Sequence, residues 1–248
     1  MSHPAGPGTS LGVKGRGKAH GGLLRPHRDE GTMTTEIERI VTANHPDRIN
    51  FTEMYVTHDA FRRDLERMAA AAAAGRTGVP QVREGWATFT RQLDVHHTVE
   101  DAWLWPKLRE RLAGRPDDLA LLDAMEAEHA LIDPQLEAID AALAADPGGV
   151  AARVEDLRLA LEQHLAHEEA AALPLIQSVM TPKVWSGFRG AMARRQRLSG
   201  AAEWIPWITD GMPPADARKW LQRMPPPLRL LNKMSWEARY RSRNLWSH

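Results

Sequence analysis

The chain has 248 residues, of which 43% are hydrophobic, and its charge is balanced, with 32 Lys and Arg against 32 Asp and Glu. It has no cysteine, which excludes disulfides, cysteine-based zinc sites, iron–sulfur clusters and thiol nucleophiles. Much of the apolar fraction is alanine and β-branched residues are sparse, which favours helices. The longest apolar run, residues 68–74, is too short to cross a membrane, and no signal peptide is predicted. We therefore expect a cytoplasmic protein.

The charges are distributed unevenly along the chain. Residues 182–248 carry 13 Lys and Arg against 4 Asp and Glu, and residues 1–32 carry 5 against 2, so the middle is acidic. The first 32 residues are rich in Gly, Pro and His without a hydrophobic period, which is typical of disorder. This pattern predicts a disordered tail over residues 1–45, a helical domain over 46–181 and a basic, Trp-rich extension over 182–248.

Four long helical segments are predicted in the middle part, over residues 49–74, 81–113, 116–146 and 150–180. They are separated by short turns that contain Gly75, Gly114 and the run Pro147-Gly148-Gly149. Short turns between long helices force neighbours to be antiparallel, so we expect an all-α fold, an up-down-up-down four-helix bundle. Two further helical segments are expected in the extension, over residues 183–197 and 214–224, before Pro225-Pro226-Pro227 breaks the pattern.

A histidine, a carboxylate four residues later and a proline ten residues later occur twice in the chain, 68 positions apart. The members are His96, Glu100 and Pro106, then His164, Glu168 and Pro174. Four residues are just over one helical turn, so each histidine and its carboxylate share a face. An imidazole nitrogen and a carboxylate oxygen directed to one point form half of a metal site.

Each predicted helix also carries one histidine at a similar distance from its turn, which places all four at one height in the bundle. These histidines are His58, His96, His129 and His164. With Glu100 and Glu168 they make six candidate metal ligands, too many for one structural zinc but suited to two ions bridged by carboxylates. Imidazole and carboxylate ligands without sulfur favour two iron ions, and manganese or zinc would also be compatible.

The chain from Tyr55 to Met180 resembles the hemerythrin-like HHE cation-binding family. The matching motifs are His-Asp-Ala-Phe-Arg-Arg-Asp-Leu from His58, His-His-Thr-Val-Glu-Asp-Ala-Trp-Leu-Trp-Pro at 96–106, Glu128-His129, and His-Leu-Ala-His-Glu-Glu at 164–169. The resemblance implies a non-heme di-iron centre that binds or senses dioxygen, peroxide or nitric oxide. It makes six residues the metal ligands: His58, His96, Glu100, His129, His164 and Glu168.

The third helix departs from the oxygen-carrying hemerythrins, which have two histidines one turn apart there. The residues one turn from His129 are Met125 and Asp133. The missing ligand could be Asp133, Glu126 or water, and a carboxylate there would lower the redox potential. Pro134 should locally bend or open this helix, because it removes a hydrogen bond beside the site.

The fourth helix offers two carboxylates. Oxygen-carrying hemerythrins place theirs five residues after the histidine, which would select Glu169, whereas the repeat of the His96 spacing favours Glu168. His97 and His167 point about a hundred degrees or more away from their ligand neighbours, so we expect supporting or surface roles for them rather than ligation.

The extension contains six of the nine tryptophans. Its favoured role is to pack over the acidic bundle as a lid or as the contact of a homo-oligomer. A membrane-surface segment is a second interpretation, and nucleic-acid binding is the weakest because no recognised motif accompanies the charge. For the whole chain we expect a protein that binds or senses a small oxidant. A peroxide-decomposing, catalase-like enzyme and a metal-free helical interaction module are the alternatives.

Overall fold

The computed structural model describes residues 48–145 and 149–247. The disordered tail expected over residues 1–45 lies outside this range. All the regular structure of the described residues is helical, which confirms the predicted all-α class. No helix among these residues is both long enough and apolar enough to cross a membrane.

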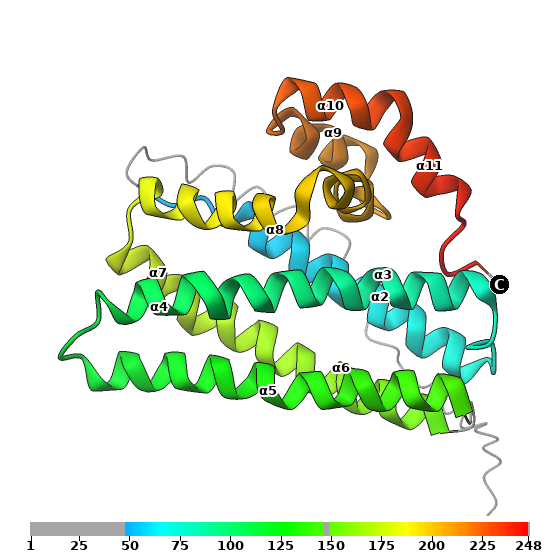
Figure 1. The fold of residues 1–248 in the computed structure, drawn as a ribbon, viewed down its shortest axis with the longest axis horizontal. Helices are drawn as coiled ribbons and strands as arrows, with labels where there is room; N and C mark the ends of the chain where they lie inside the picture. Colours follow the sequence, from blue (N-terminus) through cyan, green and yellow to red (C-terminus); the bar gives the residue numbers. More distant parts are fainter. Residues whose placement is uncertain (1–47, 146–148, 248) are drawn as a thin grey trace, which may run out of the picture.

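The middle of the chain is an antiparallel four-helix bundle, as predicted (Figure 1). Its main helices are α2 (Thr52–Ala73), α3 (Pro80–Val99), α5 (Pro116–Ala145) and α6 (Val150–His167). Two of them are extended by a π-helix and then a short α-helix: η1 (Glu100–Leu104) and α4 (Trp105–Arg109) after α3, and η3 (Glu168–Ala172) and α7 (Leu173–Val179) after α6. The predicted ranges agree with these bounds to within a few residues, but the two π-helices were missed.

The π-helices have a local cause in the repeated prolines. In each, the backbone N–H of the residue before the proline, Trp105 or Leu173, bonds to the carbonyl five residues earlier, on Glu100 or Glu168. A proline in a regular α-helix lacks an N–H and its ring clashes with the carbonyl four residues earlier, and one wider turn relieves this conflict. A wide turn therefore begins at each of the two repeated carboxylates.

A single proline inside α5 has a smaller effect. We expected Pro134 to bend or open this helix; α5 continues through it to Ala145, so the helix is not opened there, and the bend stays a prediction. The other described helices of the bundle close in the expected way. Gly75 and Gly114 adopt φ angles of +66° and +83° in the turns after α2 and α4, a conformation that glycine adopts without strain.

The apolar core is divided into two clusters along the bundle axis. One contains Phe61, Leu93 and Leu161, and the other contains Leu104 and Leu173. In each main helix the predicted histidine lies in sequence between residues of the two clusters. The bundle therefore has a polar layer with an apolar plug on either side, which keeps bulk water away from the histidines.

The extension forms four further helices joined by short turns. They are α8 (Pro182–Thr209), α9 (Pro214–Gln222), α10 (Pro226–Leu231) and, after the π-helix η4 (Asn232–Trp236), α11 (Glu237–Ser242). The run of prolines separates α9 from α10, but Pro226 also begins α10, a start that the sequence reading did not anticipate. The helix α8 contains a kink at Arg197, whose φ is +56°.

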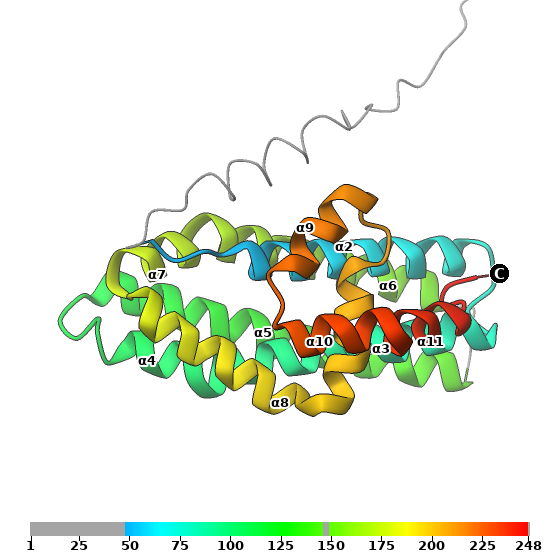
Figure 2. The same ribbon diagram turned by 90° about the horizontal axis from the view of Figure 1, so that it is seen from above.

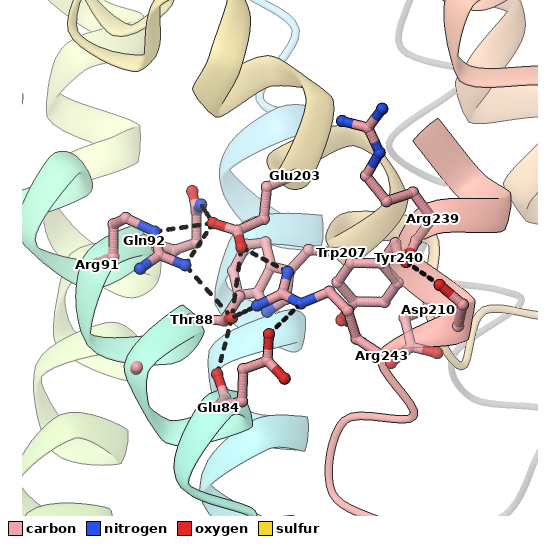
Figure 3. Close-up of polar contacts among 12 residues, drawn as sticks. Glu84, Thr88, Arg91, Gln92, Glu203, Trp207, Asp210, Arg239, Tyr240 and Arg243 are labelled. Carbon is pink, nitrogen blue, oxygen red and sulfur yellow. Dashed lines mark hydrogen bonds and ion pairs between the residues drawn. The ribbon is translucent and has the colours of Figure 1, made fainter. Parts of the chain in front are cut away.

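The extension packs against α2 and α3, on the side of the bundle opposite to α5 (Figures 1 and 2). Figure 3 shows one set of contacts that holds it there. Arg243, just after α11, donates to Glu84 and Thr88 of α3 at 2.7 and 3.0 Å, and to Glu203 of α8 at 2.6 Å. Glu203 also accepts from Arg91 of α3. One glutamate thus joins α8, α3 and the end of α11.

A second set of contacts is buried. Asp64 of α2 is fully buried and accepts 2.7 and 2.8 Å hydrogen bonds from the indole N–H of Trp207 and from Arg63. At the far end, the ring of Trp246 lies on Gly85 so closely that a Cβ on this glycine would be 2.5 Å from it. The extension therefore packs on the bundle as part of its fold, as the favoured interpretation of this segment expected.

Candidate metal centre

The four predicted histidines meet in the buried layer with their Nε2 atoms facing one another in two pairs. Nε2 of His58 lies 3.3 Å from Nε2 of His96, and Nε2 of His129 lies 3.1 Å from Nε2 of His164. All four side chains are buried. The helices α2 and α3 thus supply one pair and α5 and α6 the other.

Two buried glutamates lie beside these pairs. Glu100 places Oε1 3.2 Å from Nε2 of His96 and Oε2 3.6 Å from Nε2 of His129, so its two oxygens face opposite pairs. Glu168 places Oε2 3.2 Å from Nε2 of His58. Both carboxylates are fully buried, and none of their four oxygens has a hydrogen-bond partner among the described residues.

Buried carboxylate oxygens without donors carry a desolvation cost that cations can offset. The donor set fits divalent transition-metal ions, because four imidazole nitrogens and two carboxylates face a common space. The ligand atoms of His58, His96 and Glu168 lie within 4.8 Å of one another, as a single ion requires. The structure thus brings all six predicted site residues into one layer.

The close approach of buried histidines and carboxylates in the layer shifts their pKa values. Burial lowers the pKa of His58, but the adjacent carboxylates of Glu168 and Glu169 outweigh it and raise the pKa to about 9. Burial would raise the pKa of Glu168, but His58 and the other histidines hold it at about 2. Burial, followed by repulsion from Glu168 and Asp101, raises the pKa of Glu100 well above its usual range. Burial and repulsion thus favour the neutral form of Glu100, whereas the neighbouring carboxylates favour the charged form of His58.

Three of the histidines are oriented from behind by carboxylates. Nδ1 of His58 lies 2.7 Å from Glu169, Nδ1 of His129 lies 2.8 Å from Asp101, and Nδ1 of His164 lies 2.9 Å from Glu128. An ionised carboxylate only accepts hydrogen bonds, so Nδ1 carries the proton and, in a neutral ring, Nε2 keeps its lone pair for a cation. Nδ1 of His96 is buried without a hydrogen-bond partner.

At the start of each π-helix, two adjacent acidic residues contact the histidines from different sides. Glu100 faces the layer while Asp101 contacts a histidine from behind, and Glu168 and Glu169 repeat this arrangement. For the fourth helix, the structure thus places Glu168 in the layer, as the spacing argument favoured, and Glu169 against His58 and Arg62. The sequence signal for this division was the pair of adjacent acidic residues that lies four and five positions after the first histidine of each repeat.

The helix-three alternatives do not reach the layer. Glu126 accepts from Arg109 at 2.8 Å, and Asp133 is exposed. His97 lies in the layer instead. It is 5% exposed, its ring stacks on that of His129 at 3.9 Å, and its ligand nitrogen lies within 4.8 Å of those of His129 and His164.

His97 and His167, the histidines expected to have supporting or surface roles, thus differ in burial. A surface position for His97 is wrong, because its side chain faces α5 and α6, where it packs on the rings of His129 and His164. His167 matches the expected supporting role, since it is partly exposed and lies 2.8 Å from the Glu128 that orients His164.

The fold and this layer define a four-helix bundle with a buried candidate metal centre of histidines and carboxylates. Residues 50–176, half of the chain, match the model of the hemerythrin HHE cation-binding domain. The chain therefore belongs to the hemerythrin HHE cation-binding family. Neither the curated proteins nor the solved structures contain a match to it.

Proposed function

We propose that the buried layer holds two iron ions and binds or senses dioxygen or a related small oxidant such as peroxide or nitric oxide. His58 and His96 hold the first ion, His129 and His164 hold the second, and Glu100 and Glu168 bridge them. In this proposal residues 46–181 are the metal-binding domain, residues 182–248 cover one side of it, and the protein works in the cytoplasm.

The observation that carries the proposal is the pair of buried glutamates without hydrogen-bond donors. A purely structural helical core gains nothing from four buried carboxylate oxygens without hydrogen-bond donors, because a buried unsatisfied polar group costs about 1–3 kcal/mol. A metal-free interaction module does not require this arrangement. Two divalent cations neutralise the carboxylates and occupy the Nε2 lone pairs together.

Iron is favoured over a structural zinc because the layer offers more than four ligands and no sulfur. When bound, a pair of ferrous ions supplies the electrons that a small oxidant requires. The residues of the chain keep the site dry and rigid: the two apolar clusters exclude water, and the outer carboxylates fix three imidazole rings. Such a site admits small diatomic or triatomic molecules more readily than large polar ones.

Metal analysis is the first test. Wild-type protein reconstituted with ferrous iron under anaerobic conditions should retain about two ions per chain after desalting, as two bridged positions require. Glu100→Gln and Glu168→Gln should lose most of this iron, whereas the exposed control Glu155→Gln should retain it. Only trace metal in the wild type would overturn the proposal.

The reaction with oxidants is the second test. The iron-loaded protein should develop a visible ligand-to-metal absorption band on exposure to dioxygen, and the band should disappear on removal of dioxygen. Oxygen evolution from hydrogen peroxide, lost in Glu168→Gln, would instead assign the catalase-like activity. An iron-loaded protein inert to dioxygen, peroxide and nitric oxide would contradict both functions.

A further inference from the structure

The outer face of the extension carries apolar side chains that point away from the protein. The helix α10 lies at the edge of the molecule farthest from α5 (Figure 1), and η4 and α11 continue it without a break. One stripe of this segment, Asn232, Trp236 and Tyr240, is buried, and η4 and α11 pack on α8. The other face carries Leu230 and Met234, also four residues apart, which are 57% and 71% exposed. The segment thus has a second apolar stripe on its outward face.

This exposure is concentrated in one place. Among the described residues, six large apolar side chains are exposed, and three of them lie within five positions here: Leu230, Leu231 and Met234. The other three are single leucines on α5, α6 and α8. Scattered exposed leucines are normal on a protein surface, whereas a cluster of them indicates a surface that contacts something else.

The charges on α9, α10 and α11 are nearly all positive. Residues 214–242 carry seven Lys and Arg against two Asp and Glu. All seven cationic residues are exposed: Arg218, Lys219, Arg223, Arg229, Lys233, Arg239 and Arg241. Both carboxylates are already paired, Asp216 with Lys219 at 3.9 Å and Glu237 with Arg241 at 2.6 Å. A surplus of five exposed positive charges, seven minus two, therefore accompanies the apolar stripe.

We propose that the outward face of α10, η4 and α11 binds the surface of an anionic membrane. Leu230 and Met234 insert among the lipid headgroups, and Arg229 and Lys233, which directly precede them in the chain, lie beside the lipid phosphates. Apolar side chains flanked by cations on the exposed face of a helix are typical of helices that lie in the membrane interface. Each Lys or Arg adds attraction to an anionic leaflet.

Other partners suit this face less well. A nucleic acid would neutralise the cations but leave the apolar side chains in water. A stable protein interface buries about 800 Å² per partner, more than three protruding side chains provide. A fluid lipid surface adapts to separate side chains and needs no complementary shape. The tryptophans of this region do not serve as anchors, because Trp220, Trp236 and Trp246 are buried.

Sedimentation of the full chain with lipid vesicles tests the proposal. Vesicles of phosphatidylcholine with one third phosphatidylglycerol should bind the wild type about tenfold or more tightly than vesicles of phosphatidylcholine alone, because only the former are anionic. Binding should weaken in about 0.5 M salt, which screens the charges. Equal binding to both kinds of vesicle, or binding to neither, would overturn the proposal.

Two double variants test the location of the binding face. Leu230→Gln with Met234→Gln removes the apolar stripe, and Arg229→Gln with Lys233→Gln removes two of its cations. Each should weaken binding to the anionic vesicles by about tenfold or more. All four positions are exposed, so circular dichroism should show unchanged helix content. Unchanged vesicle binding in either double variant would overturn the proposal.

The matched control makes the same apolar change on another side of the molecule. Leu131→Gln with Leu159→Gln replaces exposed leucines of α5 and α6 and should bind vesicles as the wild type does. An equal loss in this control would overturn the assignment to the extension. Tighter binding to a DNA duplex than to anionic vesicles, or a dimer in sedimentation velocity that disappears in Leu230→Gln with Met234→Gln, would assign a different partner and overturn it as well.

These outcomes are separate from those of the proposed function. The residues of the outward face do not belong to the buried layer, so vesicle binding can be measured whether or not the protein retains metal.

Discussion

The two halves of the layer of histidines and glutamates are built alike, but they differ in the residues that surround them. The hairpin of α2 and α3 supplies His58 and His96, and that of α5 and α6 supplies His129 and His164. Each half sends one glutamate into the layer and uses the next acidic residue to hold a histidine of the other half from behind. The layer therefore has an approximate twofold arrangement that the repeated sequence encodes.

The two halves differ in the charge of the residue that lies four positions after their first histidine. Arg62 follows His58 and donates to Glu169 at 2.9 Å, whereas Asp133 follows His129. Asp101, the counterpart of Glu169, is 43% exposed, and no lysine or arginine among the described residues forms an ion pair with it. Burial, and then repulsion from Asp101 and Asp94 against the pull of His129, raises the pKa of Asp133. The second position lies in the more negative surroundings.

The histidines of the two halves also differ in the partners of their rings. In the first half, Nδ1 of His96 has no acceptor, while in the second half Glu128 holds His164 and His97 stacks on His129. We infer that the two metal positions are inequivalent: the first is adjacent to a cavity under the extension that His96 lines, and the second has a third histidine within reach.

The strongest test of this comparison removes one ligand from each half. We expect His58→Ala to empty the first position and His129→Ala to empty the second, so that each variant keeps about one ion, because both bridging glutamates remain. Metal content after desalting, measured by mass spectrometry, gives the number. The loss of both ions from both variants would show that the layer binds metal as a single cooperative unit.

His97 provides the next test. His97→Phe keeps a flat ring against His129 but removes the nitrogens, so it should weaken zinc at the second position by about 10-fold or more, the scale of losing a group that ligates or supports a ligand. The first position should be unaffected. In the control His167→Phe, only a partly exposed contact to Glu128 is lost, and a smaller change is expected. Equal effects of the two variants would assign His97 a packing role.

The pH dependence of metal affinity should also differ between the two positions. Without metal, the pKa of His58 is raised to about 9, so a metal at the first position must displace a proton at neutral pH. Affinity there should rise about tenfold per pH unit for this proton up to about pH 9. Burial lowers the pKa of His164 and so disfavours its charged form, and we expect less proton displacement at the second position. Zinc titrations between pH 6.5 and 9 should show the steeper dependence at the first position.

The same raised pKa has a consequence for the stability of the metal-free protein. A histidine whose pKa is higher in the folded state stabilises the fold fully below its unfolded value near 6.5 and loses this contribution as pH rises through 9. The midpoint of thermal unfolding of the metal-free protein should therefore fall over this range. A midpoint that rises between pH 6.5 and 9 would contradict the protonation of His58.

The sequence predicted the bundle and its layer because both depend on spacing. Helix lengths, short turns and the heights of four histidines follow from 3.6 residues per turn, and the structure brings all six predicted residues together. The burial of His97 was missed because a residue about a hundred degrees from His96 on α3 still faces another helix of the bundle, α5, where it stacks on His129. The partners of the extension, such as Asp64 with Trp207, could not be predicted, since they join positions 143 residues apart without a periodic signal.

The smallest expected effect comes from exchanging the residue that distinguishes the halves. Asp133→Arg gives the second half the positive side chain that Arg62 provides in the first, where it can pair with Asp101. Two unit charges about 10 Å apart in water interact by about 0.4 kcal/mol, so a change of two charges near a divalent ion amounts to about 1.7 kcal/mol without salt. Screening at 0.15 M ionic strength reduces this to about 0.5 kcal/mol, so zinc at the second position should bind about twofold more weakly. The effect should diminish in 0.5 M salt, because salt screens exposed charges.

The matched control is Asp156→Arg, which makes the same charge change on the exposed face of α6, two turns before His164. Its effect on the second position should be clearly smaller than that of Asp133→Arg. If the two variants weaken zinc equally, only the net charge of the protein matters, and the local difference between Arg62 and Asp133 has no influence on the centre. If only Asp133→Arg acts, the acidic surroundings of the second position set its affinity for metal.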